Sequence, residues 1–176
     1  SAWLKKHYPA EFMAAQISSD MDNTDKVVHM VNECQAMGIE VMQPDINLGE
    51  IHFKAVRGEK TVRYGLGAIK GVGEAALEGV IAERKANGPY TGLFDLCARS
   101  NRKLNRRVLE ALILSGALDS LHDNRQAMLS TVPNALQKAE QKQKDEEAGQ
   151  SDLFGDALSF EAENADELVA VSEMSQ

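Results

Sequence analysis

The chain has 176 residues, of which 43% are hydrophobic and 26% are charged, a composition that favours a globular fold over a wholly disordered one. We find no apolar run of membrane-spanning length and no signal peptide, so we expect a cytoplasmic protein with no membrane partner. The net charge of −8 argues at first sight against nucleic-acid binding.

The charge is, however, unevenly distributed along the chain. Residues 1–53 carry a net −5, residues 54–125 carry +5, and residues 126–176 carry −8. A local basic face matters more for binding nucleic acid than the total charge does. The middle segment is therefore the part of the chain that could bind a polyanion.

Three helices are predicted at the start of the chain. The first ends near His7, and because Ser1 rather than Met opens the sequence we expect a fragment of a longer protein. Pro9 suits the first turn of a second helix, and the spacing of Val27, Val31 and Cys34 predicts a third that ends at Gly38. Between them, Asp20, Asp22 and Asp25 lack the glycine turn and distal Glu of a calcium loop, so we interpret them as a solvated loop and cap.

The cysteines and histidines do not predict a metal site. Cys34 and Cys97 lie far apart in different helical patterns, which favours buried thiols in a reducing compartment over a disulfide or a metal pair. The four histidines show no ligand spacing; they are His7, His29, His52 and His122. We therefore expect neither zinc nor another cofactor in this segment.

A short apolar run at residues 39–42 ends before Pro44. Residues 53–56 and 61–64 then alternate apolar and polar side chains around Arg57-Gly58-Glu59-Lys60. This pattern predicts a β-hairpin. A hairpin of this size must pack on the helices to be stable.

The most informative stretch runs from Leu66 to Ile81. It predicts a short helix, a bend at Gly71-Val72-Gly73, and a second helix that begins near Glu74. Glycine permits positive φ and close approach to the backbone, and the exposed amides of a helix N-terminus attract phosphate. Val72 would point inward. We predict a helix–hairpin–helix phosphate site formed by Lys70, Gly71, Val72 and Gly73.

The same stretch has two other possible interpretations. A plain helical turn could use the glycines for geometry alone. A dinucleotide-binding fingerprint is rejected, because the third glycine falls at Gly71, one residue too late, and no βαβ unit follows.

A second, weaker unit of the same kind follows. The preceding helix ends at Asn87-Gly88-Pro89, and residues 93–96 predict a short apolar turn over the core. A further helix opens at Lys103 to Arg107, breaks at Ser115 to Asp119, and is followed by another helix. The predicted binding residues of this unit are Lys103, Asn105, Arg106, Arg107, Gly116 and Ala117, beside Arg102. The alternative is an ordinary solvated basic face.

The rest of the chain is predicted to be an exposed helix over residues 126–148 and an acidic linker over residues 149–176. Within this linker, the apolar pair Leu153-Phe154 has no core to join. It either folds back on the domain or inserts into a partner's apolar groove.

Three stretches resemble the C-family replicative polymerases of bacteria, the catalytic α subunits of DNA polymerase III. They are residues 2–15, residues 64–74 with Tyr-Gly-Leu-Gly-Ala-Ile-Lys-Gly-Val-Gly-Glu, and residues 104–110 with the Leu-Ser-Gly-Ala that follows at 114–117. Residues 150–154 are similar to that family's clamp-binding pentapeptide, Gln-x-x-Leu-Phe. The resemblance covers nearly the whole chain and is weakest after Phe160.

The resemblance implies a mainly α fold: the end of the fingers at 1–38, a β-hairpin with a tandem helix–hairpin–helix domain at 39–125, and an extended acidic tail. The palm, whose aspartates hold two Mg²⁺ ions, would lie upstream. The intact protein would thus be a DNA-directed DNA polymerase, a nucleotidyltransferase, while this segment would hold no catalytic residue and be inactive alone.

We expect the segment to grip the backbone of primer–template duplex DNA without sequence specificity. Gln150, Asp152, Leu153 and Phe154 would bind the sliding clamp, and other holoenzyme subunits would be partners. Two alternatives remain. One is a glycosylase-like repair enzyme, although Gly88-Pro89 is followed by Tyr90 rather than by a catalytic Asp. The other is a helical scaffold that does not bind DNA.

Overall fold

The computed structural model describes residues 2–100 and 103–155, with side chains described as far as residue 149. The chain divides into two compact units, residues 1–139 and 140–176. The helices are α1 (Ala2–His7), α2 (Pro9–Ser19), α3 (Thr24–Ala36), the 3-10 helix η1 (Leu66–Ala68), α4 (Glu74–Asn87), α5 (Leu93–Arg99), α6 (Arg106–Leu114) and α7 (Arg125–Gly155). The strands are β1 (Glu40–Met42), β2 (Lys54–Ala55) and β3 (Thr61–Arg63). The mainly helical fold class is thus confirmed.

The three strands form one small sheet in the order β1-β3-β2. The predicted β-hairpin is present as the antiparallel pair β2–β3, in which Lys54 lies opposite Arg63. The sequence analysis missed that residues 40–42 are a strand, which pairs in parallel with β3. A three-residue strand carries little periodicity, and its partner lies about twenty residues further along the chain.

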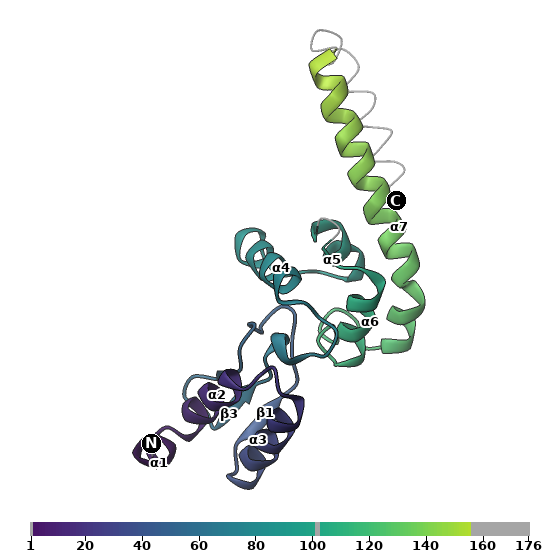
Figure 1. Cartoon of the computed structure of the whole chain (residues 1–176). Coiled ribbons are helices and arrows are strands. Elements are labelled where there is room, and N and C mark those ends of the chain that lie inside the picture. The colour runs from purple at the N-terminus through teal and green to yellow at the C-terminus, as the bar shows by residue number, and fades with distance from the viewer. Residues whose placement is uncertain (1, 101–102, 156–176) are drawn as a thin grey trace. The chain divides into compact units, whose positions relative to one another are not determined.

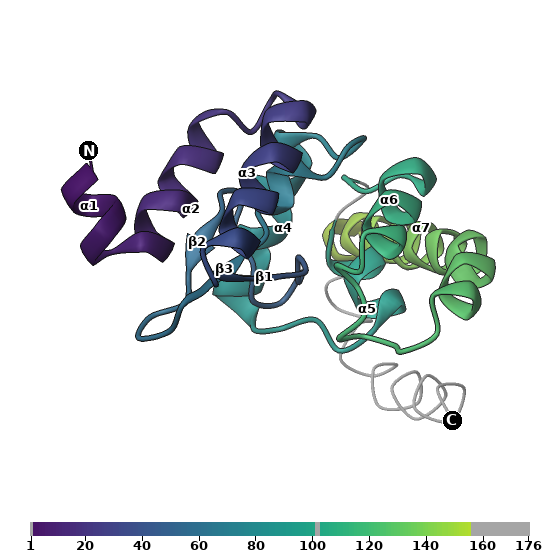
Figure 2. The ribbon, with the colours of Figure 1, turned by 90° about the horizontal axis from the view of Figure 1, so that it is seen from below.

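The first core joins this sheet to the N-terminal helices. α2 and α3 contact each other and the sheet (Figures 1 and 2). Met13 and Ile17 of α2 pack with Cys34 of α3 and with Val62 of β3, and all four are almost fully buried. The sheet therefore shares its core with residues 1–38, although the sequence analysis grouped it with the helices that follow.

The second core holds the two predicted helix–turn–helix units together. α4, α5, α6 and the start of α7 gather around it (Figure 1). Its fully buried side chains include Leu77, Leu96, Leu109, Leu118 and Val132. The buried apolar residues of α4 are Leu77, Val80 and Ile81, and their spacing is the helical repeat of an amphipathic face.

Two elements, α5 and α7, differ from the sequence expectations. Residues 93–99 form a full helix, α5, rather than a turn, and Phe94 on it is exposed. α7 begins at Arg125 and buries Met128, Val132 and Ala135, so its first turns are core rather than an exposed helix. α7 also continues to Gly155, which makes the first residues of the predicted linker helical. Residues 156–176 lie outside the described part of the chain.

Candidate nucleic-acid interface

The first glycine bend connects η1 to α4 and leaves its backbone accessible. Gly71 and Gly73 are exposed, whereas Val72 between them is buried in the second core, as predicted. The amide of Val72 donates to the carbonyl of Ile69 over 3.3 Å. Within the described residues, the amides of Gly71 and Gly73 have no recorded acceptor. Together with the first-turn amides of α4, they are available to an incoming anion.

The two glycines serve different purposes. Gly71 has φ +92°, a conformation that side chains of L-residues rarely adopt, so the turn itself requires glycine. Gly73 is the N-cap of α4 with φ −74° and ψ 142°, an ordinary extended conformation. A Cβ atom built on Gly73 would meet nothing within 4 Å. The absence of a side chain at Gly73 therefore keeps the space in front of the α4 N-terminus open.

α6 lies directly beside this bend. A Cβ atom on Gly71 would lie 3.9 Å from the Cβ of Ala111 in α6. Arg107 is one helical turn before Ala111, on the same face of α6, and is exposed. It takes part in no recorded ion pair within the described residues. Arg107 and Lys70, also exposed, are the cationic side chains best placed to accompany the free amides.

The other predicted binding residues of this region have structural partners. Arg106 Nε donates to Glu110 Oε1 over 2.9 Å, which neutralises part of its charge. Asn105 caps α6, its Oδ1 accepting from the amide of Val108. The Lys103 side chain lies along α4, with Nζ 2.6 Å from the position that a Cβ on Gly79 would take. Arg102 lies outside the described residues.

The second bend is covered, and Gly116 and Ala117, which the sequence predicts to be binding residues, do not present free amides. Gly116 has φ +89°, but its amide donates to Ile113 O, and that of Ala117 donates to Leu112 O. Gln43 and Arg125 lie over Gly116, each with an atom 2.9 Å from the position of a Cβ. The physical reason is that the bend packs against the loop between β1 and β2, where the Ile46 amide donates to Ala117 O.

Arg125 is held over this bend by an ion pair. Its Nη2 donates to Asp119 Oδ2 over 2.8 Å, and Nη1 reaches the carbonyl of Leu114. The hydrogen bond from Arg125 lowers the pKa of the Asp119 carboxyl. The two units are therefore not equivalent, because one bend is open and the other is closed by side chains from distant segments.

The cysteines are buried free thiols, as predicted. Burial raises the pKa of Cys97 to about 11 and also raises that of Cys34. A thiol with a raised pKa is protonated at neutral pH and is a poor nucleophile.

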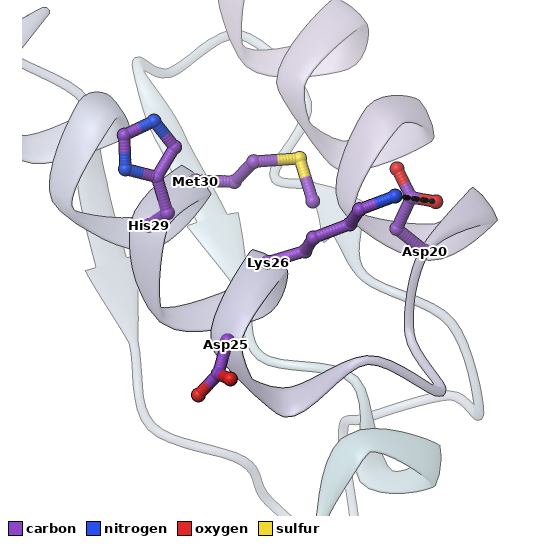
Figure 3. A pocket seen from close by; sticks show the side chains of 5 residues that line it. All are labelled: Asp20, Asp25, Lys26, His29 and Met30. Atoms are coloured by element: carbon purple, nitrogen blue, oxygen red, sulfur yellow. Dashed lines mark ion pairs between the residues drawn. The ribbon is translucent and has the colours of Figure 1, made fainter.

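The acidic loop after α2 borders a surface hollow of about 340 Å³ (Figure 3). Lys26 Nζ lies 3.7 Å from Asp20 Oδ1, whereas the carboxylate of Asp25 points away from this pair. Asn23 caps α3 through the amide of Lys26. This arrangement agrees with the interpretation of the segment as a solvated loop and cap.

The predicted clamp-binding residues fall in the last turns of α7, which ends at Gly155. The side chains of Gln150, Asp152, Leu153 and Phe154 lie outside the described residues. Their role stays a prediction from the sequence.

Among the described residues, no helix is both long enough and apolar enough to cross a membrane.

Gln43 and Arg125, which cover Gly116, are not among the site residues that the sequence predicts. No local signal could have found Gln43, which lies 73 residues before the glycine that it covers.

A family model described as "Helix-hairpin-helix motif" matches residues 38–128. DNA polymerase III subunit alpha of Escherichia coli (strain K12) is 53% identical over 154 residues, which make up 87% of this chain and 13% of the relative. The protein of the same name from Xylella fastidiosa (strain Temecula1) is 50% identical over 158 residues, or 89% of this chain and 13% of the relative. That from Haemophilus influenzae is 51% identical over 154 residues, again 87% and 13%.

The chain thus spans about 13% of the length of these curated relatives. The family model covers more than half of the chain, including both glycine bends and the helices around them. The chain therefore belongs to the helix–hairpin–helix family, and nearly all of it is similar to one segment of DNA polymerase III subunit alpha.

Proposed function

We propose that this chain is the duplex-binding segment of a replicative DNA polymerase and that it holds the DNA backbone without reading sequence. The observation that carries the proposal is the open bend at Gly71–Gly73, whose free amides lie beside α6, the helix that carries the exposed Arg107. Amides and cationic side chains are the groups that hold phosphate oxygens. A polymerase must copy any sequence, and phosphate contacts suit that need.

The proposed grip is asymmetric. The first bend binds a phosphate through its amides, with Lys70 and Arg107 supplying charge. The second unit contributes through the side chains of Arg106 and Arg107, because the amides of Gly116 and Ala117 are already used. The catalysis of nucleotide transfer, with its Mg²⁺ ions, would belong to other parts of a full-length polymerase.

A substitution at Gly73 tests the grip without disturbing the fold. Asp and Asn at an N-cap both accept hydrogen bonds from the first-turn amides, so each should keep or slightly raise stability. The extended φ and ψ and the open space at Gly73 allow either side chain. Gly73→Asp places a negative charge where the phosphate would lie, whereas Gly73→Asn is the neutral control of the same shape.

We expect Gly73→Asp to weaken duplex binding about tenfold relative to Gly73→Asn, by like-charge repulsion at a distance of a few ångströms. The measurement is fluorescence anisotropy of labelled duplexes of two unrelated sequences at several salt concentrations. The wild-type affinity should fall steeply with salt and be equal for the two sequences. Wild-type affinity in the Gly73→Asp variant, or a wild type that does not bind duplex at low salt, would refute the proposed grip.

The pentapeptide Gln150–Phe154 supports a second part of the proposal, a tether to the polymerase's sliding clamp. Two adjacent large apolar residues in an acidic segment suit an anchor for a partner's groove. A tether raises the effective concentration of the polymerase at the primer end even when each contact is modest.

A further inference from the structure

A second group of cations lies on the strand pair β2–β3. Between Lys54 and Arg63 the sequence holds four cationic side chains, with Glu59 as the one carboxylate among them. The register places Lys54 directly opposite Arg63. Like charges opposite each other on antiparallel strands are destabilising, so this arrangement costs the sheet some stability.

No carboxylate relieves this repulsion within the described residues. None of the ion pairs in the described part of the chain involves a cation of the strand pair; the arginines that they use are Arg84, Arg99, Arg106 and Arg125. The recorded partner of the Arg63 guanidinium is the sulfur of Met42, at 3.8 Å. The cations of β2 and β3 therefore have no carboxylate at ion-pair distance within the described residues.

These side chains also share a hollow. Lys54, Arg63 and His52 line a surface depression of about 120 Å³ together with Glu50. The Glu50 carboxylate is directed to α4 instead, with Oε1 3.4 Å from Arg84 Nη2 and 3.3 Å from Lys85 Nζ. An anion placed in the hollow would thus meet two cations without a competing ion pair.

The side chains around the hollow indicate which anion it suits. Binding of single-stranded nucleic acid relies on exposed aromatic rings that stack on bases. Phe53 is buried and packs on Tyr64, with ring centroids 4.6 Å apart, and no Phe, Tyr or Trp ring lines the hollow. The site therefore suits a backbone phosphate rather than an unstacked base.

The distance along the chain permits one duplex to contact both sites. Arg63 and Gly71 are eight residues apart, a stretch that spans at most about 28 Å when fully extended. One turn of duplex DNA is longer, about 34 Å. From these observations we propose that Lys54 and Arg63 form a second contact with the DNA backbone, separate from the glycine bend. This inference rests on the proposed duplex binding.

The test compares two double variants of the whole 176-residue chain. Lys54→Gln with Arg63→Gln removes the opposed charges, whereas Lys142→Gln with Lys144→Gln removes two exposed charges from α7 as a matched control. Duplex binding is measured by anisotropy against salt, with Gly73→Asp in parallel. We expect the variant with Lys54→Gln and Arg63→Gln, the strand-pair variant, to lose about tenfold in affinity. The slope of the logarithm of its binding constant against the logarithm of the salt concentration should fall by about 2, or one per phosphate contact.

The variant should melt at the same temperature as the wild type or higher, because the repulsion between opposed strands is removed. A loss of affinity no larger than that of the α7 control, or a lower melting temperature, would overturn the second contact. If Gly73→Asp weakens binding and the strand-pair variant does not, this inference fails alone. A wild type that does not bind duplex removes both proposals.

Discussion

At the scale of single residues, Gly71 and Gly73 look alike in the sequence but differ in what they require. The positive φ of Gly71 excludes most side chains, while Gly73 adopts an ordinary conformation. The sequence analysis predicted the bend correctly, because two glycines around one apolar residue are a strong local signal. It could not assign the two roles, since both depend on backbone angles.

This difference predicts that stability depends on Gly71 specifically. Gly71→Ala should lower the free energy of unfolding by about 1–2 kcal/mol, the cost of a left-handed conformation for an L-residue. The added Cβ would make only an ordinary contact with Ala111, so the backbone is the cause. Gly71→Asn should lose less, because Asn adopts this conformation more readily. Urea unfolding of the two variants measures the effect, and a Gly71→Ala protein as stable as the wild type would contradict it.

At the scale of elements, the open bend is held in place by α4 and by the loop between β1 and β2. The amides of Leu66 and Gly67 in η1 donate to Glu50 O and Ile51 O. That loop is in turn held by buried Arg84 of α4, whose Nη1 donates to Ile46 O over 2.8 Å and to Gly49 O over 2.7 Å. The two helices that flank the bend are thus connected through one guanidinium.

Arg84 should therefore be far more important for stability than its neighbour Lys85, although both contact Glu50. Arg84→Met keeps the apolar stem but leaves two buried carbonyls without donors, and we expect a loss of about 3 kcal/mol. Lys85→Ala breaks an exposed ion pair and should cost less than about 1 kcal/mol. Chemical denaturation distinguishes them, and similar losses in the two variants would show that the loop does not depend on Arg84.

The closed second bend shows that local sequence patterns predict helices and turns but not whether the backbone amides of a turn are free. The break at residues 115–119 and the helices on either side were predicted from local patterns, and the structure confirms them. Whether the amides there were free depended on Gln43 and Arg125 folding over Gly116. Such coverage arises from tertiary packing, which no periodicity or turn signal records.

At the scale of the whole molecule, ion pairing explains why net charge does not tell which cationic side chains are available to bind DNA. The basic middle segment carries +5, yet many of its arginines are used within the fold. The cations that form no ion pair within the described chain include Lys54, Arg63, Lys70 and Arg107. They belong to β2–β3, the open bend and α6. The sequence predicted the basic segment, and the structure identifies which of its charges are available.

The proposed tether at residues 150–154 predicts how a full-length polymerase that carried them would bind its sliding clamp. Leu153→Ala with Phe154→Ala should abolish binding to the isolated sliding clamp and shorten the products made in one binding event. The reason is that an apolar groove recognises large side chains, and removing both anchors removes most of the contact energy. Duplex binding by the 176-residue chain should be unchanged, because the glycine bend and the cations beside it remain.

The acidic tail offers a matched control. Leu158→Ala with Phe160→Ala also removes one leucine and one phenylalanine but leaves Gln150 to Phe154 intact. Surface plasmon resonance on immobilised clamp compares the two double variants, and primer extension with a trap for released polymerase measures processivity. If both variants bind the clamp equally well, residues 150–154 are not the tether. If only the first loses binding, the spacing Gln-x-x-Leu-Phe carries the recognition, because general apolar character is the same in both.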